Sequence, residues 1–211
     1  MSASTLYDRI RELRSGGVGE EVRRRVAEFH ELSSRGAEEW FSELCFCILT
    51  ANSSAVLGLR IQREVGAEGF LTWPQERLAR RLSELGHQYA ERRAEFIVEA
   101  RGLGDVKEIV TRFGEERLAR EWLVENVKGL GYKEASHFLR NVGYLNVAVL
   151  DRHVLRALAE HGVIDEVPKT LTKRRYLEIE RRLEALAENM GLTLGELDLY
   201  LWYTRTGRVL K

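Results

Sequence analysis

Apolar residues recur along the chain every three or four positions, the spacing of one face of an α-helix. From Trp40 to Ala51 they form a wide stripe, which predicts a buried helix. From Tyr176 to Met190 the stripe is narrower and interrupted by Arg and Glu, which predicts a surface helix with one face on a core. Further stripes cover residues 78–85, 96–103, 118–127 and 138–142. Glycines separate the stripes and none alternates with period two, so we predict an all-α protein.

One short run, Val147–Leu150, is β-like, and it equally fits an extended connector. No apolar run approaches the roughly 20 residues that a membrane-spanning helix needs, so no membrane partner is expected. The first eight residues lack a basic start followed by an apolar stretch, so no signal peptide is expected. Cys45 and Cys47 lie two apart in an apolar helical run, which predicts two small buried side chains in a cytoplasmic protein.

The most informative segment reads Val-Lys-Gly-Leu-Gly-Tyr-Lys-Glu-Ala over residues 127–135, between two helical stripes. Gly129 and Gly131 flank Leu130, and glycine permits a tight reversal while Leu130 enters the core. We expect both glycines to contact DNA, because their bare backbone lets the sugar-phosphate chain approach closely. The amides at the start of the next helix then face outward and carry partial positive charge, which suits a DNA phosphate. An ordinary helix-turn-helix connection with glycine in the turn is the alternative.

The segment resembles the helix-hairpin-helix motif, and Lys133 resembles the nucleophile of the bifunctional members of the helix-hairpin-helix DNA glycosylase superfamily. A lysine amine must lose its proton before it attacks the anomeric carbon of a deoxyribose. The positive end of a helix and burial against a nucleotide both disfavour the charged amine at this position. The alternative is a solvated lysine on a helix surface.

Asp151 comes directly after the apolar run Val147–Leu150 and before another helical stripe. The resemblance implies a catalytic aspartate about this far from Lys133, across the cleft from it. As a carboxylate, Asp151 could stabilise positive charge on the sugar or help to deprotonate Lys133. Aspartate is also a preferred N-cap, and both roles can hold together.

The chain has 33 basic and 33 acidic residues, so charge placement rather than net charge must favour DNA. The segment 128–156 is locally basic, and we expect Arg152 and His137 to contact DNA. Its basic residues are Lys128, Lys133, Arg140, Arg152 and Arg156, against Glu134 and Asp151. No cysteine or acid completes a zinc ligand set with the histidines, so no metal site is predicted.

Several stretches are similar to one branch, the archaeal-type 8-oxoguanine DNA glycosylase/lyases (the second Ogg subfamily), from about residue 20 onward. The stretches are residues 47–52, 92–101, 131–143 and 202–211. This resemblance implies excision of 8-oxoguanine from double-stranded DNA through a lysine imine, followed by β-elimination. It implies no required cofactor, although hairpin carbonyls in the family hold a monovalent cation. Two cysteines rather than four exclude the iron–sulfur cluster of the endonuclease III branch.

The same resemblance assigns roles in recognition. Asn52 would enter the gap left by the extruded base, or it is simply a turn asparagine. Trp202 and Tyr89 would sandwich the flipped base, with a plain core position as the alternative for Trp202. We expect the last helix to run to residue 211, where Lys211 would distinguish 8-oxoguanine from guanine at N7 or C8. The alternative is a disordered terminal lysine.

The resemblance also implies two helical lobes with a DNA-binding cleft between them, in a monomeric protein. One lobe would span residues 35–142 and end in the helix-hairpin-helix, and the other would combine 1–34 with 143–211. Three other functions stay open: a glycosylase/lyase for another lesion, a non-catalytic helix-hairpin-helix DNA-binding protein, and a helical protein–protein scaffold.

Overall fold

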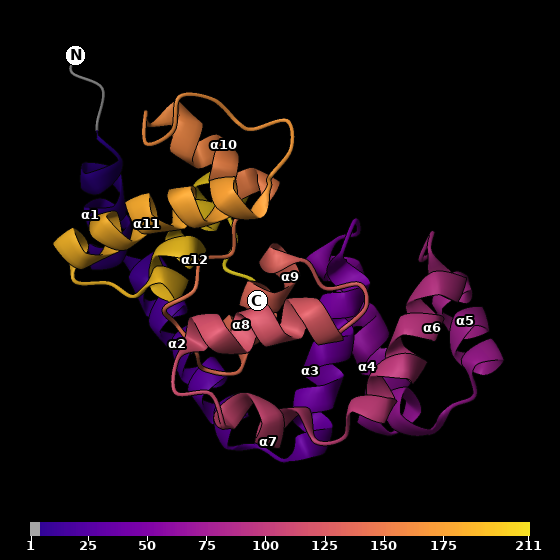
Figure 1. The fold of residues 1–211 in the computed structure, drawn as a ribbon. Coiled ribbons are helices and arrows are strands. Elements are labelled where there is room, and N and C mark those ends of the chain that lie inside the picture. The colour runs from indigo at the N-terminus through magenta and orange to yellow at the C-terminus, as the bar shows by residue number, and fades with distance from the viewer. Residues whose placement is uncertain (1–4) are drawn as a thin grey trace. The chain divides into compact units, whose positions relative to one another are not determined.

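A computed structural model describes residues 5–211 of the chain. Met1–Ser4, part of the stretch for which no signal peptide is expected, lie outside the described residues. The described residues form twelve α-helices and one 3-10 turn, with no strand (Figure 1). The all-α prediction is confirmed. The helices are α1 (Leu6–Ser15), α2 (Gly17–Ser34), α3 (Ala37–Thr50), α4 (Ala55–Thr72), α5 (Gln75–Glu84), α6 (Ala90–Ala100), α7 (Val106–Thr111), α8 (Glu116–Asn126), α9 (Tyr132–Asn141), α10 (Arg152–Glu160), α11 (Lys173–Met190) and α12 (Leu194–Thr206).

The chain divides into two compact units. One is Glu31–Val142, and the other joins the described residues up to His30 to Gly143–Lys211. The dividing line falls inside α2. The role of the predicted lobes, 35–142 and 1–34 with 143–211, in forming a DNA-binding cleft stays a prediction.

The core of the unit Glu31–Val142 is built around α3. Every residue of this helix from Trp40 to Thr50 is buried, as the wide apolar stripe predicts. Cys45 and Cys47 form no disulfide and are fully buried, which confirms their interpretation as small core side chains. Trp40 meets Phe138 of α9 edge to face, with ring centroids 5.9 Å apart. This contact anchors α9, the helix that carries the predicted nucleophile, to the core.

A buried arginine holds α8 and α9 together on either side of the glycine turn. Arg120 of α8 donates from Nη1 to Ser136 Oγ of α9 at 3.1 Å, and its guanidinium lies 5.3 Å from the centre of the Tyr132 ring. Tyr132 also donates its hydroxyl to Glu121 of α8. Leu130, between the two glycines, is buried as expected. The two helices therefore present the turn as a fixed element.

The second unit gathers α1, α10 and α11 against α12 (Figure 1). Its extended run Val147–Leu150 pairs with side chains of α11 instead of with a strand. Tyr176 donates its hydroxyl to the Ala148 carbonyl, and the Ala148 amide donates to Glu180 Oε1 at 2.9 Å. Because these side chains satisfy the backbone, the run is a connector, and it delivers Asp151 to the start of α10.

The last helix is shorter than predicted. We expected it to run to Lys211, but α12 ends at Thr206. Gly207 takes a left-handed conformation with φ 68°, and its amide donates to the Tyr203 carbonyl at 2.8 Å. A left-handed glycine is a common helix terminator. Residues 208–211 are therefore non-helical.

No helix in the described part of the chain is both long and apolar enough to cross a membrane.

Candidate active site

The glycine turn between α8 and α9 needs a glycine at one of its two positions. Gly129 has φ 89°, and a Cβ there would lie 2.6 Å from Cδ2 of Phe96. Gly131 is extended, and a Cβ there would meet only the carboxylate end of Glu134, at 3.3 Å. The expectation that both glycines make the reversal is therefore correct for Gly129 alone.

Lys133 occupies the second position of α9. Its side chain is 26% exposed, and its Nζ lies 3.0 Å from Glu134 Oε1. The other carboxylate oxygen of Glu134 accepts a hydrogen bond from the Gly131 amide at 3.3 Å. The amine is thus tied to the turn through one carboxylate, unlike a lysine that extends freely into solvent.

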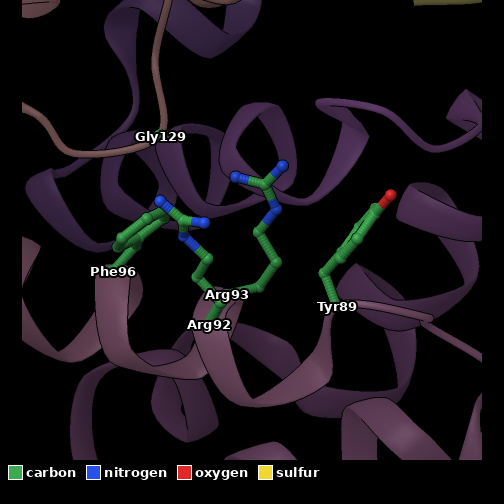
Figure 2. Close-up of a pocket in the computed structure, with 5 residues that line it drawn as sticks. All are labelled: Tyr89, Arg92, Arg93, Phe96 and Gly129. Atoms are coloured by element: carbon green, nitrogen blue, oxygen red, sulfur yellow. The ribbon is translucent and has the colours of Figure 1, made fainter.

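A surface pocket of about 260 Å³ lies beside the turn. Its lining residues are Tyr89, Arg92, Arg93, Phe96 and Gly129. Figure 2 shows the side chains of the two arginines between the rings of Tyr89 and Phe96. The Arg92 guanidinium lies 5.4 Å from the centre of the Phe96 ring, and Tyr89 is 43% exposed. Guanidinium groups bind phosphates and exposed rings stack on bases, so this surface has the chemistry of a nucleic-acid contact.

Arg93 connects the pocket to the turn between α3 and α4. It is 6% exposed, and its Nη2 donates to the Ala51 carbonyl at 2.7 Å. Burial lowers the pKa of the Arg93 guanidinium, and the Glu134 carboxylate opposes this shift. Asn52, which follows Ala51 in the chain, is exposed and has φ 57°. The interpretation of Asn52 as a turn residue is confirmed, and its insertion into DNA stays a prediction.

His87 fixes the backbone that precedes Tyr89. Its Nδ1 accepts from the Tyr89 amide at 3.2 Å, so its Nε2 carries the proton that bonds to the Leu49 carbonyl at 2.9 Å. Burial lowers the pKa of His87, which favours this neutral form. The C-terminal end of α3 and the start of α6 are thereby linked through an imidazole.

Asp151 caps α10 and is held on both carboxylate oxygens. Oδ1 accepts from the amides of His153 and Val154, each at 2.8 Å, which confirms the N-cap prediction. Oδ2 accepts from the Trp202 indole at 3.1 Å. The His153 ring meets Trp202 edge to face at 5.9 Å. Trp202 is partly exposed rather than a plain core residue, and it orients the carboxylate.

Two residues of the basic segment do not contribute to its surface. His137 is 7% exposed and packs edge to face against Phe46, so it presents no donor to DNA on the surface of this unit. Arg140 is 4% exposed and bonds to the Asn141 side chain through Nε and Nη2. Both lie in the stretch Ala135–Asn141 of α9, in which every residue is buried. Arg152 is exposed, and Lys211 is partly exposed.

The described residues contain no group of three His, Cys, Asp or Glu side chains that could hold a metal ion.

A family model described as 8-oxoguanine DNA glycosylase matches residues 22–192, a span that includes Lys133 and Asp151. The chain belongs to this family. An 8-oxoguanine DNA glycosylase/AP lyase of Methanocaldococcus jannaschii is 54% identical over 206 residues, covering 98% of this chain and 99% of the relative. A relative of the same description from Korarchaeum cryptofilum is 52% identical over the whole of both chains.

Solved structures of the 8-oxoguanine DNA glycosylase family have the same fold. The M. jannaschii glycosylase/lyase, crystallised with a 15mer DNA containing 8-oxoguanine, superposes with a TM-score of 0.95 at 54% identity, covering 98% of this chain and 99% of that one. The Thermotoga maritima 8-oxoguanine DNA glycosylase gives 0.91 at 48% identity, covering 98% of each chain.

The sequence pattern singled out Lys133 and Asp151 as the predicted nucleophile and acid, but not the side chains around them. Arg92 and Arg93 lie four and three residues before Phe96, a spacing that places all three on one helix face. Glu134 lies at the third position of a helix after a glycine turn, where a carboxylate commonly bonds back to the capping amide. Both signals are visible in the sequence. The sequence does not show, however, that α6 lies against the turn, where Phe96 contacts Gly129.

Proposed function

We propose that this chain removes 8-oxoguanine from double-stranded DNA and then cleaves the strand at the resulting abasic site, with Lys133 as the nucleophile of both steps. The observation that carries the proposal is the position of the Lys133 amine. It lies two residues beyond the last glycine of the turn, partly exposed and bound to Glu134, in a member of the 8-oxoguanine DNA glycosylase family.

The reaction starts with the neutral amine of Lys133. Its lone pair bonds to C1′ of the sugar as the bond from C1′ to the base breaks, and the base leaves with that electron pair and takes up a proton. The amine loses a proton and the sugar ring opens to give an imine. Loss of a C2′ proton then expels the 3′ phosphate, and hydrolysis of the imine returns the lysine.

Asp151 is proposed to stabilise positive charge on the sugar while the base departs. Three hydrogen bonds, from two α10 amides and the Trp202 indole, support this role because they fix the direction of the carboxylate. A preorientated carboxylate needs no rearrangement when charge develops. The proposal requires both Asp151 and Lys133 to reach the same nucleotide once DNA is bound.

Other groups are proposed to bind the DNA. Amides at the start of α9 and the exposed Arg152 would hold phosphates, and Asn52 would fill the space of the extruded base. Tyr89 and Trp202 would stack on bases, which returns about 1–3 kcal/mol each against an extrusion cost of a few kcal/mol. Lys211 would read the N7 or C8 position of the lesion.

The finer architecture belongs to the same proposal: two helical lobes with a DNA-binding cleft, acting as a monomer on cytoplasmic, nucleoid-associated DNA. The steps above use only amine and carboxylate chemistry and require no cofactor. A monovalent cation at the carbonyls of the turn would help to hold a phosphate, because carbonyl oxygen is a suitable ligand for hard cations.

Borohydride trapping across a panel of duplexes tests the proposal. A covalent adduct is expected with 8-oxoguanine DNA and is expected to be lost in Lys133→Gln. Stronger trapping with an oxidised pyrimidine or a mismatch would assign another lesion. DNA binding without trapping would indicate a non-catalytic helix-hairpin-helix protein, and neither result would favour a scaffold.

A further inference from the structure

We propose that Glu134 is the positioning residue of Lys133 and the acceptor of its proton, an inference that rests on the function proposed above. Glu134 is the residue that touches both parts of the site on α9. Its Oε1 lies 3.0 Å from the Lys133 amine, and its Oε2 accepts from the Gly131 amide at 3.3 Å.

The contact between Lys133 and Glu134 is not the usual pairing of a helix surface. Neighbouring residues on a helix point in different directions, and ion pairs normally join residues three or four apart. The two side chains meet because Glu134 turns back over the first turn of α9 to reach the Gly131 amide. Glu134 is also largely buried, with 13% of its side chain exposed, so the pair is partly shielded from solvent.

The surroundings give Glu134 a defined orientation. The buried guanidinium of Arg93, from α6, interacts electrostatically with Glu134. The Gly131 amide holds the second oxygen. The Arg93 charge on α6 thus attracts the carboxylate, while Gly131, which precedes α9, and Lys133 contact it directly. Such a carboxylate can direct the amine without a large conformational search.

The chemical step is one proton transfer. The N–H bond of the Lys133 ammonium breaks as an O–H bond forms on Glu134, which leaves a neutral amine and a neutral carboxylic acid. No electron leaves the pair and no further reactant is needed. The amine lone pair is then available for C1′.

DNA binding would couple to this transfer through the Gly131 amide. That amide is one of the donors expected to bind a phosphate, and it is the donor that Glu134 occupies in the protein alone. A phosphate at Gly131 would take the amide and release Oε2. The carboxylate is then no longer shared with the amide, and its Oε1, which lies beside the amine, can accept the proton of Lys133.

Two substitutions separate proton acceptance from capping. Glu134→Gln keeps the length and an oxygen that can still bond to the Gly131 amide, but it removes the carboxylate. Glu134→Asp keeps the carboxylate on a shorter side chain. A proton acceptor predicts that Asp retains more activity than Gln, whereas a cap alone predicts the reverse order.

The experiment measures single-turnover borohydride trapping on 8-oxoguanine DNA with protein in excess, together with the affinity for DNA that carries a tetrahydrofuran abasic analogue. Glu134→Gln is expected to slow trapping about 100-fold and to bind DNA at least as tightly as the wild type, since a negative charge is gone. Glu99→Gln is the matched control. It removes a carboxylate that pairs with Lys128 of the same turn at 2.7 Å, and its trapping rate is expected to stay near the wild type.

A Glu134→Gln trapping rate within about threefold of the wild type, or a faster rate for Gln than for Asp, would overturn the inference. Weakened DNA binding that accounts for the whole loss of rate would do the same. The failure of the proposed function looks different, because the wild-type protein itself would then not trap.

Discussion

At the residue scale, backbone amides fix the directions of one candidate carboxylate in each unit. Asp151 receives two amides of α10 and the Trp202 indole, and Glu134 receives the Gly131 amide. A local pattern predicted the Asp151 cap, because an acid at the start of an apolar helical stripe is a preferred N-cap. The Trp202 contact could not be predicted, since it joins residues 51 apart along the chain.

Asp151→Asn tests the aspartate at this scale. We expect the variant to fold, because asparagine is nearly as good an N-cap, and to bind DNA. Base release from 8-oxoguanine DNA is expected to fall about 100-fold or more, because the negative charge proposed to stabilise the sugar is lost. Single-turnover release measured with thermal denaturation and DNA affinity checks this. Release rates equal to those of the wild type would remove Asp151 from the mechanism.

At the element scale, the turn between α8 and α9 depends on its contact with α6. Gly129 has both a positive φ and a ring at 2.6 Å from the position of a Cβ, whereas Gly131 has neither constraint. The sequence predicted a glycine turn, its buried Leu130 and the helices on both sides. It treated the two glycines alike because the packing partner, Phe96, lies 33 residues earlier.

Replacement of each glycine by alanine separates the two positions. Gly129→Ala is expected to lower the free energy of unfolding by about 1–3 kcal/mol, because the backbone is strained and Phe96 must move. Gly131→Ala is expected to cost less than about 1 kcal/mol. Denaturant titration of both variants provides the comparison. Equal losses of stability would mean that Phe96 and the positive φ do not constrain the turn.

The end of α12 illustrates what a helical pattern leaves open. The apolar residues Val209 and Leu210 continue past Thr206, so the pattern alone predicted helix to residue 211. The conformation of one residue decides the matter, because Gly207 adopts φ 68° and ends the helix. Glycines separate the other helical stripes of this chain, and Gly207 likewise predicts the end of the last helix.

At the scale of the whole molecule, the net charge is zero, so attraction to DNA depends on where the basic residues lie. The 33 basic and 33 acidic residues cancel, so DNA affinity has to come from local basic surface. The segment 128–156 was expected to supply it, yet Arg140 is buried and Lys128 pairs with Glu99. Arg92, exposed at the rim of the pocket beside the turn, is basic surface that the linear count missed.

Salt dependence tests that placement. Arg92→Gln is expected to weaken binding to undamaged duplex DNA and to reduce the slope of log affinity against log salt by about one ion. Arg112→Gln is the control, because Arg112 lies at the end of α7, pairs with Glu108 and does not line the pocket. Titrations by fluorescence anisotropy at several salt concentrations give both slopes. Identical slopes for the two variants would place the phosphate contacts elsewhere.

The central claim is that one amine, the Lys133 Nζ, bonds to the sugar. Its most direct test is to trap the wild-type protein on 8-oxoguanine DNA with borohydride, digest the complex and locate the nucleotide remnant by mass spectrometry. The account predicts the remnant on Lys133, and it predicts full trapping by Lys128→Gln, which changes the neighbouring lysine of the same turn. A remnant on Lys128, Lys211 or any other amine would contradict it.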